Sequence, residues 1–130
     1  MVFNMERGKL IIKGRLPGLN EYIDAERRHR QVAAKMKREA EETVMWAAKT
    51  SLRNAKIPIP CVMNYLWVEP NRKRDLDNIS AYGRKVVQDA LVKAKYLPGD
   101  GWACIAGFTD TFAVDPKNPR IEITFEEAKK

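Results

Sequence analysis

The segment from Arg72 to Asn78, RKRDLDN, places two carboxylates directly after three cations. In an extended segment Asp75 and Asp77 would point to the same side, about 6.5–7 Å apart at their Cα atoms, with Leu76 turned into the core. Two or three such carboxylates are enough for Mg²⁺, which keeps several of its waters. A metal beside a bound phosphate is typical of nucleases. The alternative is that the two aspartates are only a helix cap and its neighbour. The cations that would hold the phosphate are Arg72, Lys73 and Arg74.

Asp100 and Lys85 are the further candidates for this chemistry. Asp100 lies in a Gly-flanked loop, and it would join the other two aspartates if the fold returns this loop to them; the alternative is a plain turn. Lys85 follows Asp77 by about 12 Å of helical rise, and its side chain would reach back toward the helix N-terminus. There it could neutralise charge that develops at phosphorus. The alternative is a solvated lysine paired with Asp89 one turn on.

Length and composition indicate a single domain over residues 1–130. With 45% hydrophobic and 32% charged residues the chain can bury a core without disulfides. It has no apolar stretch of the ~20 residues that a membrane span needs and no signal-peptide pattern. We therefore expect a cytoplasmic protein without a membrane partner.

Residue usage excludes several classes of site. His29 is the only histidine, and Cys61 and Cys104 lack ligand spacing, which argues against a zinc site and against Ser-His-Asp or Cys-His hydrolysis. The two thiols are expected to be buried and free. The net charge of +7 and pI of about 9.5 favour an anionic partner such as nucleic acid, without distinguishing it from other polyanions.

Hydrophobic periodicity predicts an α+β protein with a single mixed, mostly antiparallel sheet of about four strands and two main helices, in the order β-α-β-α-β-β. The long helix would be broken or frayed near Arg27, Arg28 and Arg30 and would bury Val32. Asp77 or Asn78 would cap the second helix. At least two of Trp46, Trp67 and Trp102 are expected in the core. The expected strands are residues 9–13, 61–69, 102–114 and 120–125, and the helices are residues 22–52 and 79–95.

Taken together, these motifs resemble the RusA-type Holliday junction resolvases, small endonucleases carried largely by prophages. The likeness rests on residues 75–78 (DLDN), on Lys85, on residues 89–91 (DAL), on Asp100, and on residues 14–20 (GRLPGLN) before a long basic helix. It extends over nearly the whole chain. One departure is that the family's lysine follows the second Asp by one helical turn, where this chain has Ala81. An extra turn would account for the later positions of both Lys85 and Asp100.

The resemblance implies a catalytic set of Asp75, Asp77, Lys85 and Asp100, with the three aspartates as ligands of Mg²⁺, or Mn²⁺ in its place. It further implies a homodimer that resolves four-way DNA junctions by paired symmetric nicks, in recombination and repair. The alternatives are a non-catalytic branched-DNA-binding protein of the same fold and a nuclease for another branched or flapped substrate. Asn20 is a weaker candidate for DNA contact or for helix capping. The expected DNA contacts are Arg72, Lys73 and Arg74, and on the first helix Arg27, Arg28, Arg30, Lys35, Lys37 and Arg38.

Overall fold

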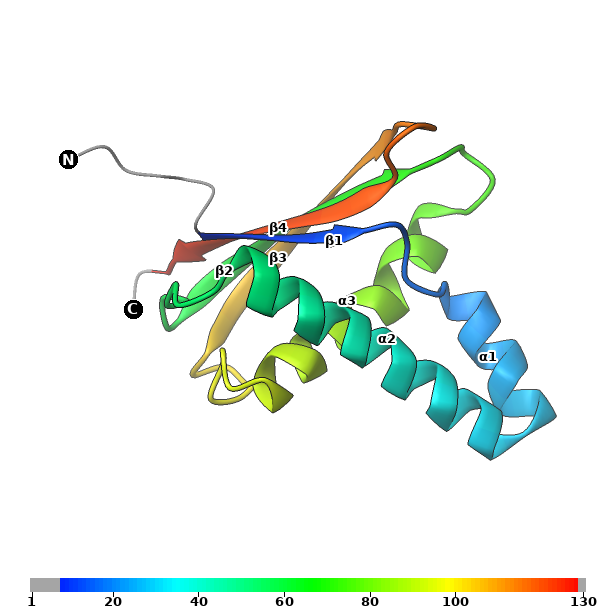
Figure 1. Ribbon diagram of the computed structural model, residues 1–130, viewed down its shortest axis with the longest axis horizontal. Coiled ribbons are helices and arrows are strands. Elements are labelled where there is room, and N and C mark those ends of the chain that lie inside the picture. The colour runs from blue at the N-terminus through cyan, green and yellow to red at the C-terminus, as the bar shows by residue number, and fades with distance from the viewer. Residues whose placement is uncertain (1–7, 129–130) are drawn as a thin grey trace.

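The computed structural model describes residues 8–128, which form four strands and three helices (Figure 1). The order β-α-α-β-α-β-β differs from the expected one only in the split of the long helix. The elements are β1 (Lys9–Lys13), α1 (Leu19–Arg28), α2 (Arg30–Ser51), β2 (Cys61–Glu69), α3 (Leu76–Lys93), β3 (Ile105–Val114) and β4 (Arg120–Glu127).

The strands form one mixed sheet in the order β1-β4-β2-β3. β4 pairs antiparallel with both β1 and β2, whereas β2 and β3 are parallel. The prediction of a mixed, mostly antiparallel sheet is confirmed. The helices cover one face of it (Figure 1). α3 is the crossover that parallel pairing of β2 and β3 requires, because the chain must return to the other end of the sheet before β3 can begin.

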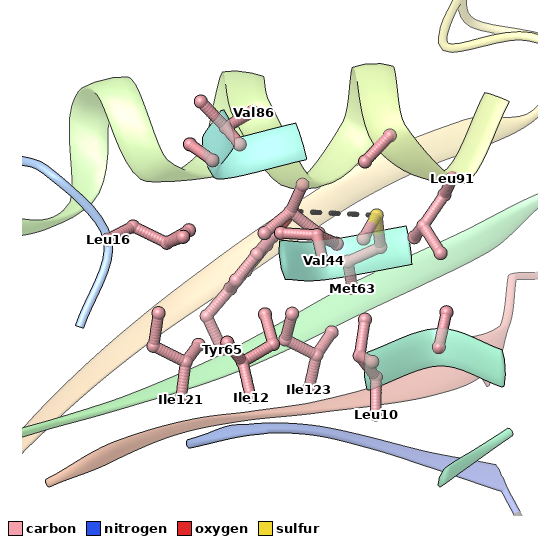
Figure 2. Packing of buried hydrophobic residues seen from close by; sticks show 14 of the residues in the cluster. Leu10, Ile12, Leu16, Val44, Met63, Tyr65, Val86, Leu91, Ile121 and Ile123 are labelled. Carbon is pink, nitrogen blue, oxygen red and sulfur yellow. Dashed lines mark hydrogen bonds between the residues drawn. The ribbon is translucent and has the colours of Figure 1, made fainter. Parts of the chain in front are cut away.

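The core lies between this face of the sheet and the helices α2 and α3. Alternate residues of β2 point into it, namely Cys61, Met63, Tyr65 and Trp67, and all four are buried. This alternation is what a half-covered strand requires. The Tyr65 hydroxyl donates to Met63 Sδ at 3.7 Å, the contact drawn as a dashed line in Figure 2. Figure 2 also shows Leu10, Ile12, Val44 and Val86 packed around this pair, from β1, α2 and α3.

The long N-terminal helix is broken at His29, close to the expected break among the arginines. His29 has an extended backbone, ends α1 and caps α2, where its Nδ1 accepts from the backbone N–H of Gln31 at 3.0 Å. One residue therefore ends one helix and begins the next. As a result α1 can pack against both α2 and α3.

Several local predictions were wrong. α3 begins at Leu76, earlier than expected, and β3 begins at Ile105, later than expected. Val32 is 50% exposed, Trp46 71% and Trp102 95%, so only Trp67 of the three tryptophans is in the core. α2 buries Ala33, Ala40, Val44 and Ala48 instead, so its buried stripe begins one position away from Val32.

None of the helices within residues 8–128 combines the length and the apolar character that a membrane crossing needs.

Candidate functional site

A groove of about 370 Å³ lies at the C-terminal ends of β2 and β3, beside the start of α3. The ends of parallel strands are common binding positions, because the chain leaves the sheet there and the next helix presents its N-terminus. Glu69 and Val114 contribute from the two strands, and Asp75 and Ile79 from α3 and its cap. The charged segment that begins at Arg72 therefore lies at an edge of the sheet where ligands commonly bind.

Asp75 occupies the N-cap position of α3, yet its carboxylate accepts no capping hydrogen bond from the first turn, which the structure describes in full. An N-cap aspartate ordinarily accepts such a bond from the helix backbone. The Asp75 side chain is exposed and lines the groove instead. It is thus available to a ligand.

Asp77 is also exposed, but it lies inside the first turn of α3. The expectation that Asp75 and Asp77 alternate along an extended segment was wrong, because the helix already begins between them. Leu76 is 55% exposed for the same reason, instead of turning into the core. Asp77 stabilises the helix N-terminus by its charge. The two aspartates therefore take the positions of the alternative, a helix cap and its neighbour, although the Asp75 side chain makes no capping hydrogen bond.

The three cations before Asp75 differ in their contacts. Arg72 and Lys73 are exposed and make no ion pair within the described part of the chain. Arg74 is largely buried: it pairs with Glu21 and donates to the carbonyl of Leu16 at 3.2 Å. Arg74 therefore fastens this loop to α1, while Arg72 and Lys73 are left for an anionic partner.

Asp100 lies away from Asp75 and Asp77, and it contacts Lys85 at 3.6 Å. Residues 8–128 contain no cluster of three or more acidic, His or Cys side chains that could hold a metal. The topology explains this: β2 and β3 are parallel, so the loop before α3 and the loop after it lie at opposite ends of the sheet (Figure 1). The structure does not bring the expected three carboxylates together.

Lys85 pairs with Asp89 one turn on, which is the alternative to a lysine that reaches back toward the helix N-terminus. Its Nζ lies 3.1 Å from Asp89 Oδ1, and Lys37 Nζ from α2 lies 3.0 Å from the other oxygen of Asp89. The hydrogen bond to Asp89 and the charges of Asp89 and Asp100 raise the pKa of Lys85. Burial acts to raise the pKa of Asp89, but the hydrogen bonds from both lysines outweigh it and the pKa is lowered. Lys85 therefore stays protonated and faces away from Asp77.

Of the basic residues expected on the first helix, Arg27, Arg28 and Arg30 lie at the corner where α1 meets α2, and Lys35, Lys37 and Arg38 lie further along α2. Arg27, Arg28, Arg30 and Arg38 are exposed. Lys37 is held by Asp89, and Lys35 lies 3.8 Å from Glu39. This corner projects at the same end of the molecule as the start of α3 (Figure 1). The corner does not line the groove, and it lies the length of α1 away from the contact between α1 and the start of α3.

Sequence reasoning missed the residues that position this site. The Asn78 side chain accepts from the backbone N–H of Asn20 at 2.8 Å, joining the starts of α1 and α3. A Cβ on Gly18 would lie 2.8 Å from Asn78 Oδ1, so this approach needs glycine. Neither Asp77 nor Asn78 is the cap, as had been expected. The contact between Gly18 and Asn78 could not be predicted from the residues near either of them, because the two are far apart in sequence.

Glu69 and Asp110 are two further acidic side chains fixed by the fold. Glu69 is only 6% exposed, and its Oε1 accepts from Arg15 at 3.2 Å beneath the groove. Asp110 accepts from the Trp67 indole N–H at 2.8 Å and from Arg84 at 2.6 Å. Each carboxylate has its own cation, so both have a structural role that needs no ligand.

The exposed carboxylate of Asp75 in the groove can supply one ligand to a hydrated divalent cation, because Mg²⁺ is often held by one or two carboxylates together with substrate phosphates. Asp77 is exposed on the first turn of α3 but is not among the residues that line the groove. The cations at the same rim can bind those phosphates. No protein-family profile matches the sequence, and a search of curated proteins finds no match.

Proposed function

We propose that the protein is a Mg²⁺-dependent, structure-specific endonuclease that resolves four-way DNA junctions by paired symmetric nicks and acts as a homodimer. The observation that carries this proposal is the uncapped, exposed carboxylate of Asp75 in the groove, close in sequence to Arg72 and Lys73, which make no ion pair within residues 8–128. A capping role alone would not leave the Asp75 carboxylate free. The net charge of +7 suits a polyanionic substrate.

In this proposal each group has a defined part. Asp75 and Asp77 would hold the cation, which would polarise the phosphodiester and stabilise the leaving oxygen. Arg72 and Lys73 position the DNA backbone, and Arg74 holds their loop against α1. Lys85 and Asp100 lie outside this set, because their side chains contact each other beyond the second turn of α3.

The homodimer follows from the substrate. A four-way junction offers two equivalent strands to cut, and two-fold symmetry supplies two equivalent sites. One chain provides one groove at the ends of β2 and β3, so paired nicks need a second chain.

The test is cleavage of a labelled synthetic four-way junction, with Mg²⁺ and with EDTA, beside a linear duplex. We expect paired, metal-dependent nicks on the junction alone. Asp75→Asn and Asp77→Asn should abolish cleavage and leave junction binding intact, because they remove metal ligands and no DNA contact. Asp24→Asn, on the exposed side of α1, is the matched control and should cut as the wild type does.

A non-catalytic branched-DNA-binding protein of the same fold is the second candidate. It is favoured by the separation of Asp100 from Asp75 and Asp77. Tight junction binding without nicks, in Mg²⁺ and in Mn²⁺, would replace the endonuclease proposal with this one.

A further inference from the structure

Part of the groove is apolar, and the proposed metal chemistry does not use it. Leu76 and Ile79 of α3 form one wall, and Phe112 and Val114 of β3 form another. Leu76 is 55% exposed and Val114 44% exposed. Two large apolar side chains are therefore about half exposed on two elements that line the same groove as Asp75.

The shape of the groove is held by contacts on each side. The Asn71 side chain accepts from the backbone N–H of Lys73 at 3.0 Å, which keeps the loop before α3 turned. The backbone N–H of Asp115 donates to the carbonyl of Glu69 at 2.9 Å, which ties the end of β3 to the end of β2. Arg74 anchors the same loop to α1. Such a groove is formed before its ligand arrives, which lowers the entropic cost of binding.

The charges of the residues that line the groove, together with its apolar walls, indicate the kind of ligand that it would bind. Arg72 is at the rim with Lys73 next to it in sequence, and neither is paired within the described residues. Two carboxylates line the groove: the buried Glu69 is paired with Arg15, and the exposed Asp75 is the one assigned to the cation. An anionic chain of a ligand would match the cations at the rim of the groove. An uncharged flat group of the same ligand would fit between the apolar walls. A nucleotide has this division, with its phosphate outside and its base inside.

We infer that the groove binds one unstacked base of a DNA strand whose phosphates lie along Arg72 and Lys73. The volume of about 370 Å³ is near the lower end of the ~300–1,000 Å³ range of small-molecule sites, which suits one nucleotide and not a base pair. The inference rests on the proposed function, since it specifies how the same site receives a branched substrate. Bases at a branch point lose part of their stacking, so they are the least costly to take out of the helix.

The first test is photocrosslinking with 5-iodouracil, placed either next to the branch point of a four-way junction or in a single-stranded oligonucleotide. Photolysis of this base joins it to an adjacent aromatic side chain. We expect the crosslink at Phe112, the aromatic residue of the groove. Crosslinks at the exposed Trp46 or Trp102 and none at Phe112, or no crosslink with either probe, would overturn the inference.

The second test measures affinity for the same junction in EDTA. Leu76→Ser and Val114→Ser should each weaken binding about three- to tenfold, because each removes apolar surface that the base would cover. Val32→Ser is the matched control, since Val32 is similarly exposed but lies on α2. Wild-type affinity in both groove variants would overturn the inference.

The two proposals fail in different ways. Crosslinking of the single strand at Phe112 without any nicking of junctions would support the base-binding groove and contradict the endonuclease. Paired nicking by the wild type, with no crosslink at Phe112 and unchanged affinity in the groove variants, would support the endonuclease and contradict the groove.

Discussion

Charged side chains that look equivalent in the sequence have different tasks in the structure. Asp75 is free at a helix cap, Asp89 is shared by two lysines, and Asp110 is held by Arg84 and the Trp67 indole. A free carboxylate at a rim can take a new cation, whereas a paired one would first have to lose its partner. Together with the position of Asp75 in the groove, this difference makes Asp75, with Asp77 close by in sequence, the proposed metal site.

The carboxylate of Glu122 makes the free energy of unfolding depend on pH, and this dependence can be tested at a single residue. The hydrogen bonds from Lys9 and then from Arg120 hold the pKa of its carboxylate below the usual 4.5. Because the pKa is lower in the folded state, this stabilisation is present above pH 4.5 and is lost as the pH falls through the folded value. Glu122→Gln should therefore cost about 1–2 kcal/mol at neutral pH and less in acid.

Urea unfolding of wild type and variant at a series of acidic pH values measures this difference. Glu42→Gln, an exposed carboxylate of α2 with no ion pair within residues 8–128, is the control. A constant difference between wild type and Glu122→Gln at all pH values would contradict the linkage.

At the scale of elements, the unit β2–α3–β3 decides which residues meet. Its parallel strands place residues 70–75 at one end of the sheet and residues 94–104 at the other. The start of α3 is fixed by α1, through Asn78 with Asn20 and through Arg74 with Glu21. The position of α1 therefore supports the geometry of the groove.

The break between α1 and α2 depends on His29 as a cap. His29→Ala removes the acceptor for the Gln31 N–H and should lower the free energy of unfolding by about 1 kcal/mol. His29→Asn retains a side-chain acceptor at the cap and should keep most of that stability. Denaturant unfolding of the two variants beside wild type measures the difference, and equal losses in both would show that the side-chain acceptor does not account for the contribution of His29.

For the whole molecule, several exposed cations lie at the end that carries the groove. Arg72 and Lys73 lie there, and the α1–α2 corner with Arg27, Arg28 and Arg30 projects from the same end (Figure 1). Such a distribution attracts a phosphate backbone over a longer range than any single contact. Lys49 and Lys56 lie toward the opposite end, near the start of β2.

The salt dependence of junction binding tests this distribution. Each phosphate contact contributes about −0.9 to the slope of log K against log salt, so Arg72→Ala with Lys73→Ala should reduce the slope by about 1.8. Lys49→Ala with Lys56→Ala makes the same change in net charge and should leave the slope nearly unchanged. Equal reductions in both double variants would mean that binding depends only on total charge.

The sequence by itself determined the α+β class, the bounds of β1 and β2, the break near Arg28 and the charged segment that lies beside the groove. These features depend on local periodicity, turn residues and composition, all of which are properties of residues that are close together in the sequence. The exposure of Leu76, Trp46 and Trp102, the anchoring of Arg74 and the approach of Gly18 to Asn78 were decided only by the tertiary structure. So was the separation of Asp100 from Asp75: strand pairing between distant segments sets which loops share an end of the sheet, and no local pattern encodes that pairing.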